Sequence, residues 1–185
     1  MGLKLSKVQT DHSYFHAKKQ LRLHFLPRKK RLRILDCFAG QQKLWNAIQD
    51  ERPNIKFDID RIEKRTMDGI YMRGDTRKYL PTIDLTKYDI IDLASYGQPI
   101  DQLAMILQRS KGRHIFITFI QSDMGQLSYR MLKELGYTYG MIQKCPLLFS
   151  KDGHQKFFQW LALHSIDKVN YILKKNKLYC HIYSN

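Results

Sequence analysis

The chain has 185 residues, 43% hydrophobic and 12% aromatic, which suits one folded domain with a sizeable core and excludes a disordered tail. Lysine and arginine total 32 against 17 aspartates and glutamates, and the resulting net charge of +15 favours a polyanionic partner. No apolar run reaches the roughly 20 residues that span a bilayer, and three scattered cysteines indicate reduced thiols in the cytoplasm rather than a disulfide framework.

Residues 1–30 read as a basic leader, partly helical around residues 13–24, in which aromatic residues are interleaved with the charges. Basic groups neutralise phosphates and aromatic faces stack on bases, so we expect nucleic acid to bind here and at the basic C-terminal tail. The expected contacts are Lys18, Lys19, Arg22, Arg28, Lys29, Lys30, Arg31, Lys174 and Lys175. A solvated charged face is the plain alternative. An anionic membrane surface is another, because residues 14–26 could form a weakly amphipathic helix.

From residue 31 onward, apolar runs typical of buried strands alternate with segments of helical periodicity. The pattern predicts strands over 32–36, 55–59, 70–72, 88–93 and 114–120. It predicts helices over 42–50, 61–68, 99–110 and 123–135, the last ending at Gly136. Two further strand-like runs, 137–143 and 156–164, are separated by a turn at 150–154, and the structure of 168–182 stays open.

This order of elements predicts an α/β fold with a doubly wound, mostly parallel, seven-stranded sheet. Two adjacent final strands without a helix between them predict an antiparallel hairpin at the sheet edge. We expect the leader to occupy residues 1–30, the α/β domain residues 31–166 and a basic tail residues 167–185.

The segment RLRILDCFAGQQKLW, residues 31–45, predicts a buried strand, a small-residue turn at Ala39-Gly40 and a helix. In open α/β sheets the ligand lies beyond the carboxyl ends of the strands, and a glycine turn lets backbone N–H groups approach it closely. Gln42 stands where a second glycine is expected. Its side chain would either point outward or crowd the ligand.

Four segments in this order resemble the motifs of class I S-adenosylmethionine-dependent methyltransferases: ILDCFAGQQKLW (34–45), FDID (57–60), GDTRKYL (74–80) and YDIIDLASYGQP (88–99). The resemblance covers residues 32 to about 165. The fourth segment is closest to the tRNA guanine N2-dimethyltransferase group, which carries Asp-Pro-Tyr/Phe-Gly-Ser-Pro after a similar strand. The resemblance implies S-adenosyl-L-methionine as the cofactor.

By this resemblance the cofactor-binding residues would be Asp36, Phe38, Gly40, Asp58 and Asp75. Asp36 and Gly40 would line the methionine end. Asp58, about 20 residues after Asp36 as ribose-binding acids are, would bind the ribose, with Asp60 as the alternative. Asp75 would accept from the adenine amino group. Each acid could instead cap a turn or helix, including the helix predicted over 61–68.

The fourth segment would present the methyl acceptor, with Asp92, Ser95 and Tyr96 as the catalytic residues. Ala94 and Ser95 stand where the related group has Asp-Pro, so Asp92 is the nearest carboxylate and Ser95 offers a hydroxyl. Tyr96 could stack on a target base.

We therefore expect a methyltransferase that acts on nucleic acid. RNA is favoured over DNA only because of the resemblance of the fourth segment. The alternative is a catalytically inactive, methyltransferase-like protein that binds nucleic acid. The histidines show no metal-ligand spacing, so no metal is expected. A protein partner or a second copy of the chain could contribute specificity.

Overall fold

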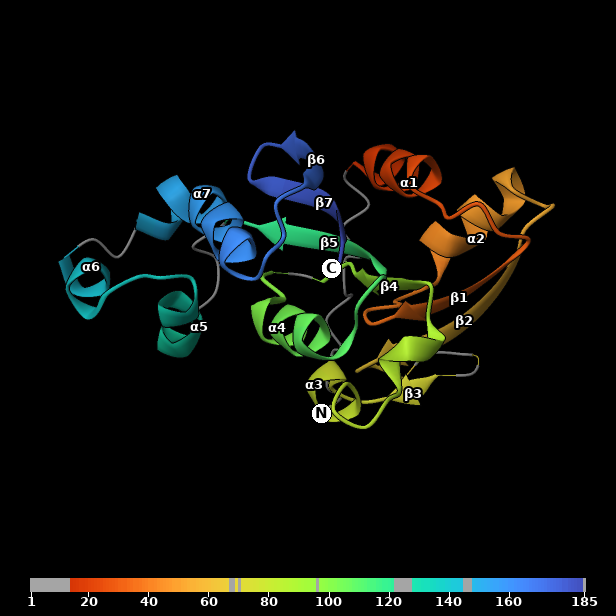
Figure 1. The fold of residues 1–185 in the computed structure, drawn as a ribbon, viewed down its shortest axis with the longest axis horizontal. Coiled ribbons are helices and arrows are strands. Elements are labelled where there is room, and N and C mark those ends of the chain that lie inside the picture. Colours follow the sequence, from red (N-terminus) through yellow and green to blue (C-terminus); the bar gives the residue numbers. More distant parts are fainter. Residues whose placement is uncertain are drawn as a thin grey trace, which may run out of the picture.

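A mixed β-sheet forms the centre of the computed structural model, which describes residues 14–66, 69, 71–95, 97–121, 128–144 and 148–184. These residues form seven strands in the order β3-β2-β1-β4-β5-β7-β6 (Figure 1). The strands are β1 (Arg31–Asp36), β2 (Lys56–Glu63), β3 (Met72–Arg73), β4 (Ile90–Leu93), β5 (His114–Ile120), β6 (Val169–Lys174) and β7 (Lys177–Tyr183). β7 pairs antiparallel with β5 and β6, and the remaining pairs are parallel. The predicted α/β fold with an antiparallel edge hairpin is confirmed.

Helices cover both faces of the sheet (Figure 1). They are α1 (Phe15–His24), α2 (Lys43–Glu51), α3 (Thr76–Tyr79), α4 (Ile100–Arg109), α5 (Tyr129–Glu134), α6 (Tyr139–Lys144) and α7 (Leu148–Leu163), with a 3-10 helix at Leu85–Lys87. α1 and α2 pack on one face, whereas α4 and α7 pack on the other.

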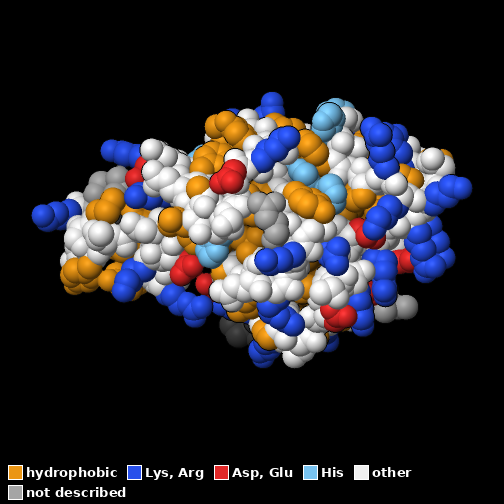
Figure 2. All heavy atoms as spheres, viewed as in Figure 1, with side chains coloured by type: hydrophobic (Ala, Val, Ile, Leu, Met, Phe, Trp, Pro, Cys, Tyr) orange, Lys and Arg blue, Asp and Glu red, His pale blue; other side chains and the backbone are white. Residues whose placement is uncertain are grey.

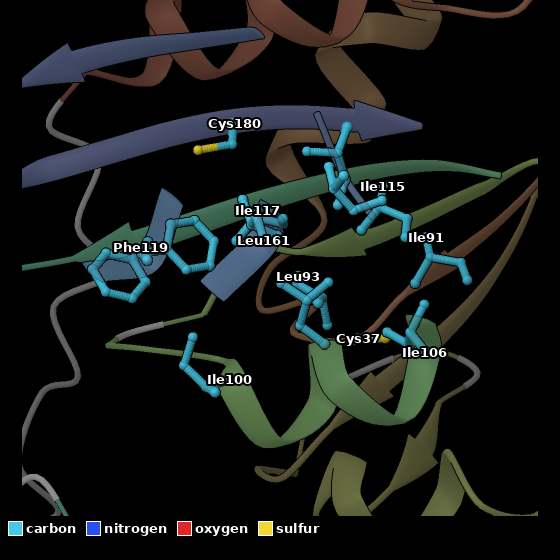
Figure 3. Close-up of a cluster of buried hydrophobic side chains, with 14 of the residues drawn as sticks. Cys37, Ile91, Leu93, Ile100, Ile106, Ile115, Ile117, Phe119, Leu161 and Cys180 are labelled. Carbon is cyan, nitrogen blue, oxygen red and sulfur yellow. The ribbon is translucent and has the colours of Figure 1, made fainter. Parts of the chain in front are cut away.

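The sheet divides the core into two hydrophobic clusters, because successive residues of a strand face opposite sides. On β1, Ile34 packs towards α1 and α2 with Trp45, while Leu35 belongs to the cluster under α4 and α7. Figure 3 shows that second cluster, in which Ile100 of α4 and Leu161 of α7 lie against β4 and β5. The central strands are buried on both faces, which explains their nearly continuous apolar runs.

The helix predicted over 61–68 is wrong, because β2 continues through Arg61 and Ile62 to Glu63. β2 lies between β1 and the two-residue strand β3, near one edge of the sheet. Only Ile62 on this strand is fully buried, and its alternating polar residues are those of a partly solvated strand. The polar run after residue 57 therefore does not end the strand.

The strands predicted over 137–143 and 156–164 are also wrong, because these residues lie in α6 and α7. In α7, Phe157, Trp160 and Leu161 are buried together at helical spacing. The predicted turn at 150–154 lies inside the same helix. The edge hairpin is formed instead by β6 and β7, from the segment expected to be a tail. Residues 123–127 of the helix predicted over 123–135 lie outside the described residues, and α5 covers 129–134.

The described parts of the predicted leader, domain and tail share one core. α1 of the leader contributes Leu21 to the cluster that contains Tyr179 of β7. In the part of the chain that the structure describes, no helix is long and apolar enough to cross a membrane.

Candidate functional site

A cavity of about 360 Å³ lies where β1, β2 and β4 end. Its lining combines carboxylates, lysines and apolar side chains from α1, the β1–α2 loop and the residues that follow β2 and β4. The lining residues include Phe15, Lys18, Asp36, Phe38, Gly40, Gln42, Leu44, Glu63, Lys64, Arg65, Asp92 and Ala94. The carboxyl ends of parallel strands are where ligands bind in open α/β sheets.

The loop after β1 is held tightly on its inner side. The Cys37 carbonyl accepts a hydrogen bond from Thr76 Oγ1 at 2.7 Å, and the Ala39 amide donates to the Ile62 carbonyl at 3.2 Å. Gly40 has φ 50°, a left-handed conformation that glycine adopts without steric cost. Asp36, Phe38 and Gly40, three of the five residues predicted to hold the cofactor, therefore line one cavity.

Gln42 occupies the second-glycine position with the backbone conformation that a glycine would have, φ 62°. Its side-chain amide donates to the Tyr71 hydroxyl, which in turn donates to the Gly40 carbonyl at 3.2 Å. The Gln42 side chain thus forms part of the cavity wall and ties the loop to the segment before β3.

Substitutions at Gln42 separate two contributions to the free energy of unfolding: the strain of its left-handed backbone and the hydrogen bond of its side chain to Tyr71. We expect Gln42→Ala to lower the free energy of unfolding by about 0.5–1.5 kcal/mol through the lost bond to Tyr71. Gln42→Gly should be more stable than Gln42→Ala by about 1 kcal/mol, because glycine avoids the left-handed strain. Urea denaturation of the three proteins measures both differences. A glycine variant less stable than the alanine variant would contradict the backbone assignment.

Glu63, at the carboxyl end of β2, is the acid of this strand that lines the cavity. Its Oε2 accepts from the Gly40 amide at 2.9 Å, and its Oε1 accepts from the Arg65 amide at 3.2 Å. Each carboxylate oxygen keeps further acceptor capacity. Sequence reasoning missed Glu63 because the strand was predicted to end at residue 59.

Asp58, the predicted ribose ligand, lies in the middle of β2 and does not line the cavity. Its carboxylate forms an ion pair with Arg31 on the neighbouring strand, and this hydrogen bond lowers the pKa of Asp58. The alternative, Asp60, accepts from the Tyr88 hydroxyl at 2.7 Å. Both side chains precede the strand end that the cavity occupies.

Asp75 caps the short helix α3, the role left open as its alternative. Its Oδ1 accepts from the Arg77 amide at 2.9 Å, and its Oδ2 accepts from the Arg77 guanidinium at 2.7 Å. The hydrogen bonds from Arg77 lower the pKa of Asp75 to about 2. Asp75 is not among the residues that line the cavity.

Asp92, a predicted catalytic acid, has its carboxylate occupied by two side chains. Arg22 donates from Nε at 2.7 Å and from Nη2 at 2.6 Å, and Trp45 Nε1 donates at 3.0 Å. Arg22 and Asp92 are each 1% exposed, so this is a buried, bidentate ion pair. The prediction that Arg22 contacts nucleic acid is wrong for this reason.

Asp36 lies beside Asp92 in the sheet, because the two residues are paired in the register of β1 and β4. Desolvation, reinforced by the negative charge of Asp92, raises the pKa of Asp36 to about 8. Asp36 accepts one hydrogen bond, from the Phe38 amide at 3.3 Å. The Asp36 carboxyl group therefore remains open to the cavity, and a bound cation would stabilise its ionised form.

The other predicted catalytic residues belong to the loop after β4. Ser95 is buried, and its hydroxyl has no hydrogen-bond partner among the described residues. Ala94 lines the cavity. Tyr96 lies outside the described residues.

Most of the predicted phosphate-binding residues of the leader are committed to ion pairs or lie far from the cavity. Lys19 pairs with Glu51, and Lys29 pairs with Asp89. Arg28, Lys30 and Arg31 are exposed at the amino end of β1, whereas the cavity lies at the carboxyl ends of the parallel strands. Lys174 and Lys175 are exposed at the tip of the β6–β7 hairpin, which lies at the carboxyl end of β5.

Lys18 differs from the rest because it lines the cavity and lies over the Tyr179 ring, with Nζ 5.4 Å from the ring centroid. Burial and the nearby Arg22 lower the pKa of Lys18. Three exposed basic residues, Lys43, Lys64 and Arg65, also line the cavity. Sequence reasoning did not single them out, because two of them were assigned to a helix after residue 60.

Comparison with known proteins gives structural neighbours only. No protein-family model matches the sequence, and no curated protein matches it. Among solved structures, the CurJ carbon methyltransferase matches with a TM-score of 0.56 and 11% identity, over 90% of this chain and 54% of that one. The chain therefore spans about half of the CurJ structure.

Two other neighbours are closer to this chain in length. A structure described as an S-adenosyl-L-methionine-dependent methyltransferase from Methanococcus maripaludis matches with a TM-score of 0.52 and 15% identity, over 93% of this chain and 85% of that one. One described as a ribosomal RNA methyltransferase from Plasmodium falciparum matches with a TM-score of 0.53 and 16% identity, over 92% and 95%. The chain has the class I methyltransferase fold. Among the described residues, no cluster of histidine, cysteine, aspartate or glutamate could hold a metal ion.

Proposed function

We propose that this protein is an S-adenosyl-L-methionine-dependent methyltransferase that acts on nucleic acid, with RNA favoured over DNA. The observation that carries the proposal is the charge pattern of the cavity, in which Asp36, Glu63 and Lys18 are brought together from β1, β2 and α1. We also propose a cytoplasmic location, consistent with the buried free thiols of Cys37 and Cys180.

The residues present fit the amino-acid and ribose parts of this cofactor. Asp36 would hold the ammonium group, whose charge favours the ionised form of this carboxyl, and the Lys18 ammonium would hold the carboxylate, since both side chains line the cavity. Glu63 would accept from the ribose hydroxyls with the acceptor capacity that the Gly40 and Arg65 amides leave free. Apolar side chains of Phe15, Phe38 and Leu44 in the lining would exclude water. When bound, S-adenosyl-L-methionine supplies an electrophilic methyl group on a positively charged sulfur.

The acceptor would enter beside the loop after β4. Ala94 lines the cavity there, and the buried Ser95 hydroxyl is unpaired among the described residues, so it could hydrogen-bond an acceptor amine. Asp92 would contribute by its negative charge and by anchoring α1 through Arg22, because its oxygens already accept three hydrogen bonds. Tyr96 keeps its proposed role as a base-stacking residue.

The basic rim of the cavity supports nucleic acid as the substrate. Lys43, Lys64 and Arg65 are exposed around the cavity. Lys174 and Lys175 lie at the carboxyl end of β5, so they are on the same side of the sheet as the strand ends that form the cavity. Such groups bind phosphates and would align the strand with the cavity.

A second candidate function is nucleic-acid binding without catalysis. It is favoured by one specific observation: the Asp92 carboxylate already accepts three hydrogen bonds from Arg22 and Trp45, and Ala94 stands where the related group carries an acid. Without a free carboxylate at the loop, only the Ser95 hydroxyl and backbone carbonyls remain there to accept a hydrogen bond from the acceptor, and neither is a base that could take its proton.

Calorimetric titration with S-adenosylhomocysteine tests the cofactor site, and we expect micromolar affinity. Transfer of a radiolabelled methyl group to RNA and DNA pools then separates the enzyme from the binding protein. A folded sample that does not bind S-adenosylhomocysteine would refute the methyltransferase and favour the inactive nucleic-acid-binding protein.

The nucleic-acid surface is tested by charge reversal. We expect Lys64→Glu with Arg65→Glu to weaken RNA binding about tenfold or more at low salt and to reduce its salt dependence. The matched control, Arg28→Glu with Lys30→Glu, makes the same charge change near the amino end of β1, away from the cavity, and should have a smaller effect. Equal losses for the two pairs would mean that binding is not centred on the cavity.

A further inference from the structure

The strand β6 is an open edge of the sheet. It is the last strand in the order and pairs only with β7 among the described residues. In Figure 1 it lies at the rim of the molecule. An edge strand presents unpaired backbone N–H and C=O groups to any second strand that approaches.

The hairpin geometry identifies which residues of β6 present these groups. A two-residue loop, with Lys175 at φ 54°, joins Lys174 to Lys177, so these two form the hydrogen-bonded pair that closes the turn. Hydrogen-bonded and non-hydrogen-bonded pairs alternate along an antiparallel ladder. The backbone groups of Val169, Tyr171 and Leu173 therefore point away from β7.

The same three residues share one face of the sheet. Val169 packs against the cluster under α4 and α7, and the Tyr171 ring lies 5.2 Å from that of Phe158 on α7. Tyr171 is nevertheless 55% exposed and Leu173 is 49% exposed. Hydrophobic side chains are visible at this rim in Figure 2.

Among the described residues, the centre of β6 lacks the proline, bulge or charge that guards many exposed edges. In β6 the register with β7 is unbroken, and its positive charges lie only at the ends, in Lys168, Lys174 and Lys175. The centre of the edge, from Val169 to Leu173, is uncharged.

We propose that β6 pairs with β6 of a second copy of this chain, antiparallel about a two-fold axis at Tyr171, to form a dimer with a continuous sheet. This register places Tyr171 opposite Tyr171 of the second copy and Val169 opposite Leu173, so all outward backbone groups are paired. The contact is isologous, as in most dimers.

In this register the charges at the two ends of the edge nearly balance. Asp167 comes to lie near Lys175 of the second copy, and Lys168 comes to lie opposite Lys174. All four side chains are solvent-exposed, so the attraction and the repulsion are both screened and small, and the match of apolar residues sets the register. An acidic extended peptide would also suit the lysines, but only a second copy also uses Asp167 and matches apolar residues on both strands.

Analytical ultracentrifugation of the nucleic-acid-free protein over the micromolar range tests the proposal. We expect a dimer for the parent protein and a monomer for Tyr171→Glu. The matched control is Tyr139→Glu, which places the same charge at a 63% exposed tyrosine on α6 and should remain dimeric. A parent protein that is monomeric throughout, or a dimer that survives in Tyr171→Glu, overturns the proposal.

A charge swap tests the register without altering the apolar edge, in case Tyr171→Glu does not fold. We expect Asp167→Lys to weaken dimerisation, because it places lysine opposite Lys175, and the double variant Asp167→Lys with Lys175→Asp to restore it. Failure of the second change to rescue the first would exclude this register. A protein that stays monomeric and binds an acidic peptide along β6 would identify that peptide, rather than a second copy, as the partner.

Discussion

Replacing Arg22 by methionine is expected to lower the free energy of unfolding by about 3–5 kcal/mol, the typical cost of leaving one member of a buried ion pair without its partner. The cause is the Asp92 carboxylate, which is 1% exposed and would keep only the hydrogen bond from Trp45. Urea denaturation followed by tryptophan fluorescence measures the change.

The double variant Arg22→Met with Asp92→Asn is the control for this effect. Removing both charges also removes the unpaired ion, and the asparagine side chain would still offer an oxygen to Trp45 Nε1. We therefore expect the double variant to be more stable than Arg22→Met alone, so the two changes are strongly non-additive. A single variant within about 0.5 kcal/mol of the parent would instead fit a solvated surface arginine.

Glu63→Gln is expected to weaken S-adenosylhomocysteine binding at least about tenfold, whereas Asp58→Asn should change it less than about twofold. Hydrogen bonds to a charged group contribute about 1.5–3 kcal/mol, and every 1.4 kcal/mol is a factor of ten in affinity. Glutamine keeps an oxygen that can accept from the Gly40 amide, so the loop contact is retained while the charge is lost.

Asp58→Asn is the matched control, because it removes a carboxylate from the same strand outside the cavity. Calorimetric titration gives both affinities. The reverse result, a loss in Asp58→Asn alone, would place the ribose at the position predicted from the FDID segment. If the parent protein does not bind S-adenosylhomocysteine, the proposed function fails and the variants cannot be compared.

The strands and turn around the cavity could be predicted from local pattern. The strand at 32–36, the turn at Ala39-Gly40 and the buried strand before Ala94 carry apolar runs and small residues that specify their own structure. Asp36, Phe38 and Gly40 consequently line one cavity. Strand ends were harder to predict, since β2 carries charged residues almost to its end and only its place near the sheet edge permits them.

The same limit explains the errors at the C-terminal end. The run at 156–164 is apolar enough for a buried strand, and its length did not distinguish it from a helix. The hairpin that occupies the sheet edge came from basic residues whose alternation was noticed but not assigned. The segment that completes the sheet is chosen by its pairing with the neighbouring strand: the β6–β7 hairpin pairs with β5, whereas residues 156–164 lie in α7.

The sequence by itself determined the α/β alternation, the loop that follows β1 and the excess of positive charge, because each is a property of residues close together in the chain or of the whole composition. Only the tertiary structure decided which charges meet: Arg22 lies 70 positions from Asp92, and Glu63 reaches Gly40 only because β2 runs beside β1. Pairing and burial depend on neighbours in space. The sequence pattern around a lysine or arginine of the leader is therefore the same whether that residue binds phosphate, lines a cavity or neutralises a buried acid.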